Sequence, residues 1–413
     1  MIVARRARLG WLLYDFANNA FSVMIVTFVF PVYFKGVVCA GLGNLGDLLW
    51  GAAGSISLVV VALLSPVLGA AADLSGRRKG FLVAAALVCI AFTAQLAWVT
   101  TGMVVAAMAL FIAANIAYQT GQVFYNAYLP DLAPAEEVGR LSGYGWAAAY
   151  LGGIAMLLAA IPLLQSGAAD SARRVFVFTA VFYLVFALPA FFLLPRAPAR
   201  QASVKPWMLI AAGIRQVKST LARLGEYRML ARFLLAYFVY MEGVSTISYY
   251  ASIYAQDTLG FTMAELVRFY LVLQTIGVAG AIGFGYLSDH LGPKRTLVIL
   301  LILWTVVGFG AAAATSKALF WVVSSLGALC LASVGAVSRS MLALMVHPSQ
   351  QTEIFGFYGI SGKFSSAVGP LLFGVTSHLS GSQRLAMAAI GLLFIAGLVL
   401  LLRVEEPPRR AAW

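Results

Sequence analysis

Four ionisable residues stand inside long apolar segments of the sequence: Asp15, Glu242, Arg339 and Lys363. A charge inside a membrane costs at least about 2.5–3.5 kcal/mol, so such side chains are expected to face a polar cavity and to have partners. Asp15 or Glu242 could take up and release a proton. Arg339 and Lys363 could hold a substrate carboxylate or pair with the two acids. Alternatively, the four residues form two fixed ion pairs that only specify packing.

Amide side chains accompany these charges. Asn18 and Asn19 follow Asp15 by one helical turn, so Asn18 or Asn19 shares its helix face. A second set recurs at spacings of three and four residues, which places its members on one stripe of a helix: Asn115, Gln119, Gln122 and Asn126. The stripe predicts amides lining a water-filled cavity, and hydrogen bonding between helices is the alternative interpretation.

One loop motif occurs twice, 216 residues apart. Residues 69–79 read GAAADLSGRRK and residues 285–295 read GYLSDHLGPKR, each with glycine, aspartate, glycine and a basic cluster at the same spacing. The same offset joins Gly143 to Gly359 and Gly153 to Gly369. Such repetition predicts two parallel halves, as in transporters whose halves rock about a site in the middle of the membrane.

Each copy of the motif suggests a gate. The aspartate can pair with a cation or with a helix N-terminus, and the second glycine (Gly76 or Gly292) permits a tight turn. The residues predicted to hold the cytoplasmic side shut are Asp73, Arg77, Arg78, Asp289, Lys294 and Arg295. The alternative is that the basic residues only anchor the loops on one side of the membrane.

The composition tells which elements carry these residues. Of 413 residues, 62% are apolar and 10% are charged, against roughly 45–50% and about 25% in soluble domains. A water-soluble fold is excluded. Segments long enough to cross a bilayer as helices lie at 9–34, 45–72, 80–98, 103–127, 141–165, 172–195, 229–256, 264–288, 294–315, 318–346, 353–379 and 383–403. The prediction is an all-α polytopic membrane protein with 12 transmembrane helices.

The basic residues orient these helices. With both termini inside, 20 Lys and Arg lie near cytoplasmic ends and six near the opposite ends. This bias predicts that both termini are cytoplasmic. The membrane is expected to be a bacterial inner membrane. The bias also explains the net charge of +13 without nucleic acid, because the cations form no basic array interleaved with aromatic residues.

The longest connection, 196–228, divides the chain into six-helix halves at 1–195 and 229–413. Its central part places Trp207, Ile210 and Ile214 on one stripe, with Arg215 and Lys218 away from it. This pattern is typical of an amphipathic helix on an anionic membrane surface. The segment is expected to be a tether between the halves, and regulation is the alternative.

Motifs for catalysis and cofactors are missing from the sequence. It contains no phosphate-binding GxxxxGK[ST] and no zinc-binding HExxH. Its three cysteines and three histidines are scattered, which suits neither a disulfide framework nor a metal cluster. We expect no enzyme activity, no cofactor and no metal.

The duplicated loop resembles the signature of the major facilitator superfamily. Longer stretches are similar to its autophagy-related vacuolar effluxer family and to bacterial relatives of that family. They are GWLLYDFANNAFSVMIVTFVFPVYF (10–34), FYNAYLPDLAPAEEVGRLSGYGWAAAYLGG (124–153), FLLAYFVYMEGVSTI (233–247) and SRSMLAL…IFGFYGISGKFSSAVGPLLFG (338–374). Glu242 and Met241 stand where that family more often has Asp and Asn. The resemblance implies the major facilitator fold, a central cavity and export of neutral amino acids.

The expected function is secondary transport of a small polar or zwitterionic metabolite by alternating access, with a neutral amino acid favoured and protons as a candidate coupling ion. The expected protein is a monomer in the lipid bilayer. Two alternatives are export of amphipathic drugs or lipids, and a transport-inactive sensor or scaffold. Buried charges disfavour a purely apolar cavity, and intact gating motifs in both halves disfavour loss of transport.

Overall fold

The protein is described by a computed structural model that covers residues 2–42, 45–164, 169–196, 211–215, 217–219, 227–261, 263–347, 349–364 and 368–406. All its regular elements in these ranges are helices. They are α1 (Ile2–Phe21), η1 (Ser22–Phe28), α2 (Val29–Tyr33), η2 (Phe34–Val38), α3 (Leu45–Ser75), α4 (Arg78–Gln95), η3 (Leu96–Trp98), α5 (Val104–Asn126), α6 (Leu129–Leu132), α7 (Val138–Leu164), α8 (Ala169–Leu193), α10 (Arg228–Asp257), α11 (Met263–Leu291), α12 (Pro293–Ala313), α13 (Lys317–Met345), α14 (Gln351–Phe364), α15 (Val368–Ser380) and α16 (Gln383–Leu402).

Within the described residues, eleven helices are long and apolar enough to cross a membrane. The predicted spans 103–127 and 318–346 are confirmed as Val104–Leu132 and Lys317–Met345. The predicted span 353–379 falls on α14 and α15, which are described on either side of residues 365–367.

The first span is irregular. Its helix begins at Ile2, ahead of the predicted start at residue 9, and changes from α-helical to π-helical geometry at Ser22–Phe28 and again at Phe34–Val38. Pro31 lies between the two π-helical stretches. Because proline has no backbone N–H, the regular hydrogen-bond ladder is interrupted there and the helix adjusts around the gap.

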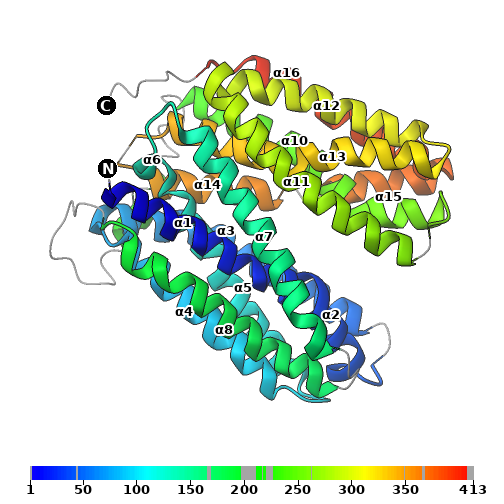
Figure 1. Ribbon diagram of the computed structural model, residues 1–413, viewed down its shortest axis with the longest axis horizontal. Helices are drawn as coiled ribbons and strands as arrows, with labels where there is room; N and C mark the ends of the chain where they lie inside the picture. Colours follow the sequence, from blue (N-terminus) through cyan, green and yellow to red (C-terminus); the bar gives the residue numbers. More distant parts are fainter. Residues whose placement is uncertain are drawn as a thin grey trace. The chain divides into compact units, whose positions relative to one another are not determined.

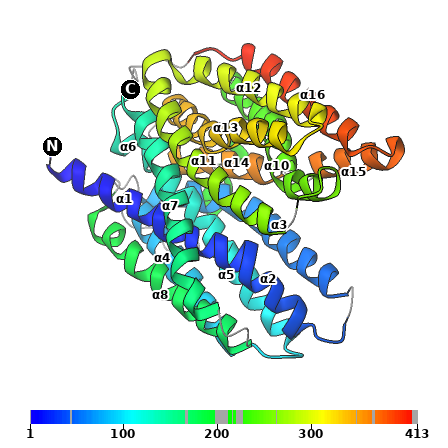
Figure 2. The ribbon, with the colours of Figure 1, turned by 45° about the vertical axis from the view of Figure 1, so that its right-hand side comes forward.

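The chain forms two compact units. Unit 1 comprises residues 1–128, 148–218 and 349–357, and unit 2 comprises residues 129–147, 219–348 and 358–413. In unit 1, α1 packs along α8, and α4 packs along both α5 and α8 (Figures 1 and 2). In unit 2, α12 packs between α13 and α16, and α11 also packs on α13. Each unit therefore takes in a short segment from the other half of the sequence.

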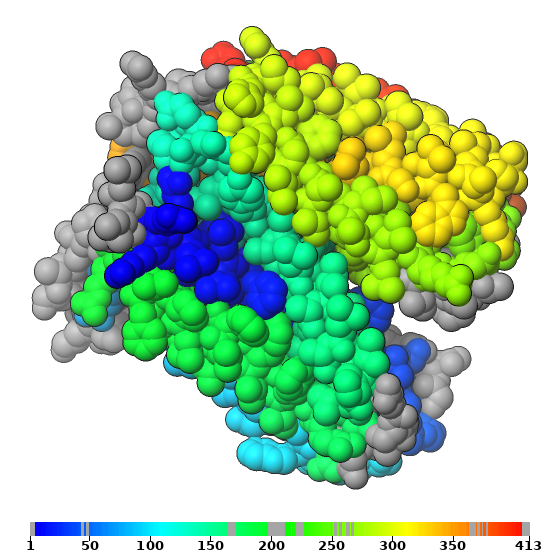
Figure 3. Space-filling model, viewed as in Figure 1, coloured from blue at the N-terminus to red at the C-terminus, as the bar shows by residue number. Residues whose placement is uncertain are grey.

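Large apolar side chains remain exposed along the helices. On unit 1, α1 and α8 lie together at the surface (blue and green in Figure 3). Val185 and Phe192 of α8 are 52% and 77% exposed. A helix that is apolar on its outer face as well as its inner face is typical of a membrane span, because lipid chains cover the outer face.

The predicted turns are confirmed. Gly76 and Gly292, the second glycines of the two loop motifs, have φ angles of 65° and 96°. These are left-handed values that glycine adopts without a steric penalty. Of the predicted amphipathic helix in 196–228, residues 211–215 and 217–219 are helical. Trp207 and Ile210 lie outside the described residues.

Candidate functional site: buried charges and two aspartate-capped helices

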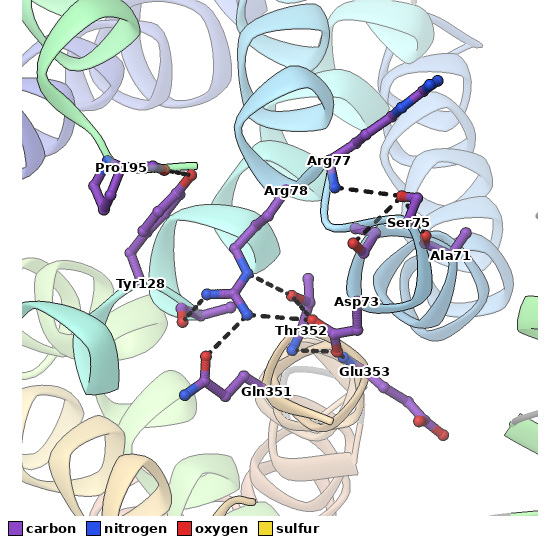
Figure 4. Close-up of polar contacts among 12 residues, drawn as sticks. Ala71, Asp73, Ser75, Arg77, Arg78, Tyr128, Pro195, Gln351, Thr352 and Glu353 are labelled. Carbon is purple, nitrogen blue, oxygen red and sulfur yellow. Dashed lines mark hydrogen bonds and ion pairs between the residues drawn. The ribbon is translucent and has the colours of Figure 1, made fainter. Parts of the chain in front are cut away.

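Asp73 lies at the end of α3 and accepts hydrogen bonds from the first turn of α14 (Figure 4). Its Oδ2 accepts from the backbone N–H of Thr352 at 2.8 Å and of Glu353 at 3.1 Å, and its Oδ1 accepts from Thr352 Oγ1 at 2.6 Å. The N-terminus of a helix has unsatisfied N–H groups and a partial positive charge, so it is a favourable place for a carboxylate. Asp73 therefore joins residues from the two halves of the sequence.

Arg78 completes this cluster, which we call cluster 1 (Asp73, Arg78, Gln351, Thr352 and Glu353). Its Nη2 lies 3.2 Å from Asp73 Oδ1, and it also donates to the side chains of Gln351 and Thr352, each at 2.9 Å. The side chains of Arg78 and Asp73 are 4% and 2% exposed. The charges compensate each other in a site that water does not reach, and the pair depends on both partners being present.

Asp289 makes the equivalent arrangement in unit 2, called cluster 2 (Asp289, Gly139, Arg140 and Glu137). Asp289 accepts from the backbone N–H of Gly139 at 2.7 Å and of Arg140 at 2.9 Å. Arg140 Nε also pairs with Asp289 at 3.1 Å, and Arg140 pairs with Glu137 at 3.0 Å. The Arg140 side chain is 35% exposed, so this cation keeps much of its hydration.

The two clusters match in register. Each aspartate binds the N–H groups of the second and third residues of its helix, α14 in one unit and α7 in the other. The first glycine of each motif allows the close approach: a Cβ on Gly69 would collide with the backbone of Thr352, and one on Gly285 with the backbone of Gly139. The internal repeat therefore extends to three-dimensional contacts.

The cations that pair with the two aspartates are Arg78, which belongs to the predicted gating set, and Arg140, which does not. Arg77 is exposed and its side chain points away from cluster 1 (Figure 4). Lys294, 216 residues after Arg78, has its ammonium 3.4 Å from the carbonyl of Leu402, and Arg295 is exposed. Asp289 takes Arg140 from the capped helix instead, because α7 has arginine at its third position where α14 has Glu353.

Asp15 is 6% exposed in the first span and belongs to a polar network in unit 1. Its Oδ2 accepts from the hydroxyl of Tyr125 at 2.9 Å, and Asn18 Nδ2 lies 3.5 Å from its Oδ1. Gln122 extends the network by donating to Asn18 Oδ1 at 3.0 Å. The network joins α1 to α5 through groups that can hold a carboxylate in either protonation state.

Tyr125 is a residue that the sequence analysis missed. Its ring stacks on Trp11, with centroids 4.5 Å apart, and on Tyr14 at 5.4 Å. Trp11 Nε1 also donates to the Tyr125 carbonyl at 2.9 Å. These contacts fix the hydroxyl that faces Asp15. Tyr125 directly precedes Asn126 in the amide-rich α5, which is the signal that could have found it.

The amide stripe has mixed roles. Gln119 Nε2 lies 3.5 Å from Asn115 Oδ1 on the same helix, whereas Gln122 bonds across to α1. Asn126 is half-buried at the end of α5. Asn19 turns away from Asp15 and donates to the carbonyl of Ala149 in α7 at 2.5 Å. Gln122 thus fits the interhelical alternative and contacts Asn18 of the acid network at the same time.

Glu242 is the buried acid of unit 2. It lies in α10, is 2% exposed, and accepts a 2.6 Å hydrogen bond at Oε2 from the backbone N–H of Gly369. A Cβ on Gly369 would meet both Thr246 and Glu242. Only glycine therefore lets the backbone come within reach of this carboxylate.

Within unit 2, Arg339 contacts Ser142 of α7. The sequence predicts that this end of α7 is cytoplasmic. Arg339 Nε donates to Ser142 Oγ at 2.9 Å and its Nη2 to the Ser142 carbonyl at 2.7 Å. It is 4% exposed in α13. Lys363 lies in α14, and its side chain is outside the described residues. These contacts indicate that Arg339 connects α13 to α7, because its guanidinium donates to the hydroxyl and the carbonyl of Ser142.

Replacing Arg339 with glutamine is expected to destabilise the protein by about 2 kcal/mol, because it removes charge-assisted hydrogen bonds from two buried acceptors. Thermal unfolding in detergent measures this. Ser142→Ala is the matched control, with a smaller loss because the backbone carbonyl remains. An unchanged melting temperature together with a raised half-saturating substrate concentration would contradict the connector role.

Residues 52–411 match the family model described as vacuole effluxer Atg22 like. The chain therefore belongs to the Atg22-like family. Among relatives of this Atg22-like chain, the MFS-type transporter YxiO of Bacillus subtilis is 31% identical over 96% of the chain and 94% of its own length. Autophagy-related protein 22 of Coccidioides immitis is 24% identical over 85% and 71%.

Solved structures show that the Atg22-like chain has the major facilitator fold. The human organic anion transporter MFSD10 (TETRAN) has a TM-score of 0.77 at 17% identity, covering 96% of this chain and 99% of its own. The proton:xylose symporter XylE bound to 6-bromo-6-deoxy-D-glucose has a TM-score of 0.72 at 17% identity, covering 99% and 96%. The Atg22-like protein is thus a multi-pass membrane transporter of the major facilitator superfamily and not an enzyme.

Proposed function

We propose that this transporter moves a small zwitterionic metabolite, a neutral amino acid first, and couples the movement to protons. The observation that carries the proposal is a buried carboxylate in a membrane span of each unit, Asp15 and Glu242. A membrane-buried carboxylate is costly when charged and is retained where it binds a cation or a proton. Both a zwitterion's ammonium group and a proton meet that description.

The substrate class follows from the same residues and from the family resemblance. Asn18 and Gln122 add amide donors and acceptors beside Asp15, which suits a substrate with both an amino and a carboxylate group. An amphipathic drug or lipid would offer few polar groups to exchange for these hydrogen bonds when it binds. The family's description as an effluxer supports export. The proposal also places the protein in a bacterial inner membrane, as a monomer with both termini in the cytoplasm.

Clusters 1 and 2 are proposed to be the cytoplasmic gate. Each joins the end of a helix from one half of the sequence to the start of a helix from the other half. Alternating access requires such contacts to form in one state and break in the other. Cluster 1, being the more deeply buried, is expected to contribute the larger part of the gate's free energy.

Uptake into proteoliposomes tests the function. The purified protein is reconstituted and given a mixture of labelled neutral amino acids, with and without an outwardly directed proton gradient (acid inside), because an exporter that exchanges its substrate for protons takes substrate up as protons leave the vesicle. We expect uptake above that of protein-free liposomes, and faster uptake with the gradient. Equal uptake rates with and without the gradient would contradict proton coupling but would still support the substrate class. No uptake by folded protein would contradict the amino-acid proposal.

A further inference from the structure

A groove of about 550 Å³ opens on unit 1 beside the start of α8. Apolar side chains line most of it, among them Leu163, Val177, Phe178 and Val181. Val177 and Val181 are 44% and 49% exposed. The groove lies on a membrane-spanning helix, so its natural contents are parts of lipid molecules.

Two arginines stand at one end of this groove, Arg173 and Arg174. Arg173 Nε donates to the carbonyl of Ala97 at 2.5 Å, which fixes that side chain against η3. Arg174 is exposed, with Nη2 3.5 Å from Ser171 Oγ. The neighbouring sequence has a single acid, Asp170, so this end of the groove carries net positive charge.

The exposed face of α8 that continues from the groove as far as Val185 matches one leaflet in length. Val177, Val181 and Val185 follow one another at intervals of four residues on the outer face of α8, and all are exposed. From Arg174 to Val185 is eleven residues, about 16 Å at 1.5 Å per residue. That is about half of a hydrocarbon core roughly 30 Å thick. The charged end therefore falls at the membrane boundary when the valines reach the midplane.

We propose that this groove is a binding site for an anionic phospholipid, whose phosphate is held by Arg173 and Arg174 and whose acyl chain lies along Val177 and Val181. Guanidinium groups bind phosphate oxygens in pairs of hydrogen bonds. A zwitterionic phospholipid brings a second, positive group to the same arginines and binds more weakly. The site is separate from clusters 1 and 2, from the acids, and from the proposed transport function.

A thermal-shift titration in detergent tests the site. The probes are dioleoyl-phosphatidylglycerol, dioleoyl-phosphatidylcholine with the same chains, and glycerol phosphate without chains. A ligand that binds the folded state raises the melting temperature, and at a given concentration the rise is larger for the ligand with the lower Kd. We expect phosphatidylglycerol to bind at least about tenfold more tightly than phosphatidylcholine, and glycerol phosphate to have no effect at the same concentration.

Variants assign the effect to the groove. Arg173→Gln/Arg174→Gln removes the charged end, and Val181→Trp fills the apolar part from an exposed position. Each is expected to remove the preference for phosphatidylglycerol. Arg268→Gln is the matched control, because Arg268 is an exposed arginine at the start of another span, and it should keep the preference. Equal binding of the two phospholipids by the wild type, or a preference that survives the double substitution, would overturn the proposal.

Discussion

Replacing Asp73 with asparagine is expected to lower the rate of transport at least tenfold. Asp73 uses one oxygen for two backbone N–H groups and the other for Arg78 and Thr352. In asparagine an NH₂ group replaces one of the two carboxylate oxygens. This group cannot accept a hydrogen bond, so the donors on one side of residue 73 lose their acceptor. Arg78, whose side chain is 4% exposed, loses the negative charge of its buried partner, which costs about 3–5 kcal/mol. That corresponds to about two to four orders of magnitude in the population of the state that contains cluster 1.

The matched control is Asp289→Asn, measured as initial uptake in the same proteoliposomes. Arg140 is one-third exposed and also pairs with Glu137, so its charge stays hydrated and compensated. We expect a loss about tenfold smaller than for Asp73→Asn. The double variant Asp73→Asn/Arg78→Gln also removes the buried positive charge of residue 78, and part of the transport rate should return. Asp73→Asn that is folded and transports within twofold of wild type would rule out the gate.

The sequence predicted the parts of clusters 1 and 2 that the repeat encodes. The offset of 216 residues identified Asp73 and Asp289 as equivalent, and the glycines identified the turns and the close approaches. Spacing could not identify the partners, because Thr352 and Gly139 lie 279 and 150 residues away from the aspartates that they bind. Positive charge close to the motif favoured Arg77, Lys294 and Arg295. The fold instead brings Arg140 to Asp289 from a distant helix.

For the buried acids too, the sequence identified the charged residues and did not identify their partners. Hydropathy identified Asp15 and Glu242, since a carboxylate in an apolar run is conspicuous whatever its surroundings. Their partners were harder to find. Tyr125 is an ordinary aromatic residue by type, and Gly369 contributes only a backbone N–H. Such partners depend on how closely two helices approach, a property of the folded chain that residue types and spacing do not reveal.

Replacing Glu242 with glutamine is expected to reduce the ratio of uptake with and without a proton gradient to about one. Glutamine has nearly the same shape and keeps an oxygen that can accept from the N–H of Gly369, so the packing around Thr246 can persist. It cannot take up or release a proton at physiological pH. The substitution therefore separates the charge of the side chain from its shape.

The control for Glu242→Gln is Glu265→Gln in the same unit. Glu265 pairs with Lys317 at 2.8 Å and is 41% exposed, so its loss costs at most about 1 kcal/mol and should leave the gradient ratio as in the wild type. Asp15→Asn completes the set. If the ratio falls in Asp15→Asn and stays high in Glu242→Gln, the coupling carboxylate is Asp15 in unit 1. A ratio that stays high in both variants would show that protons are not coupled through either buried acid.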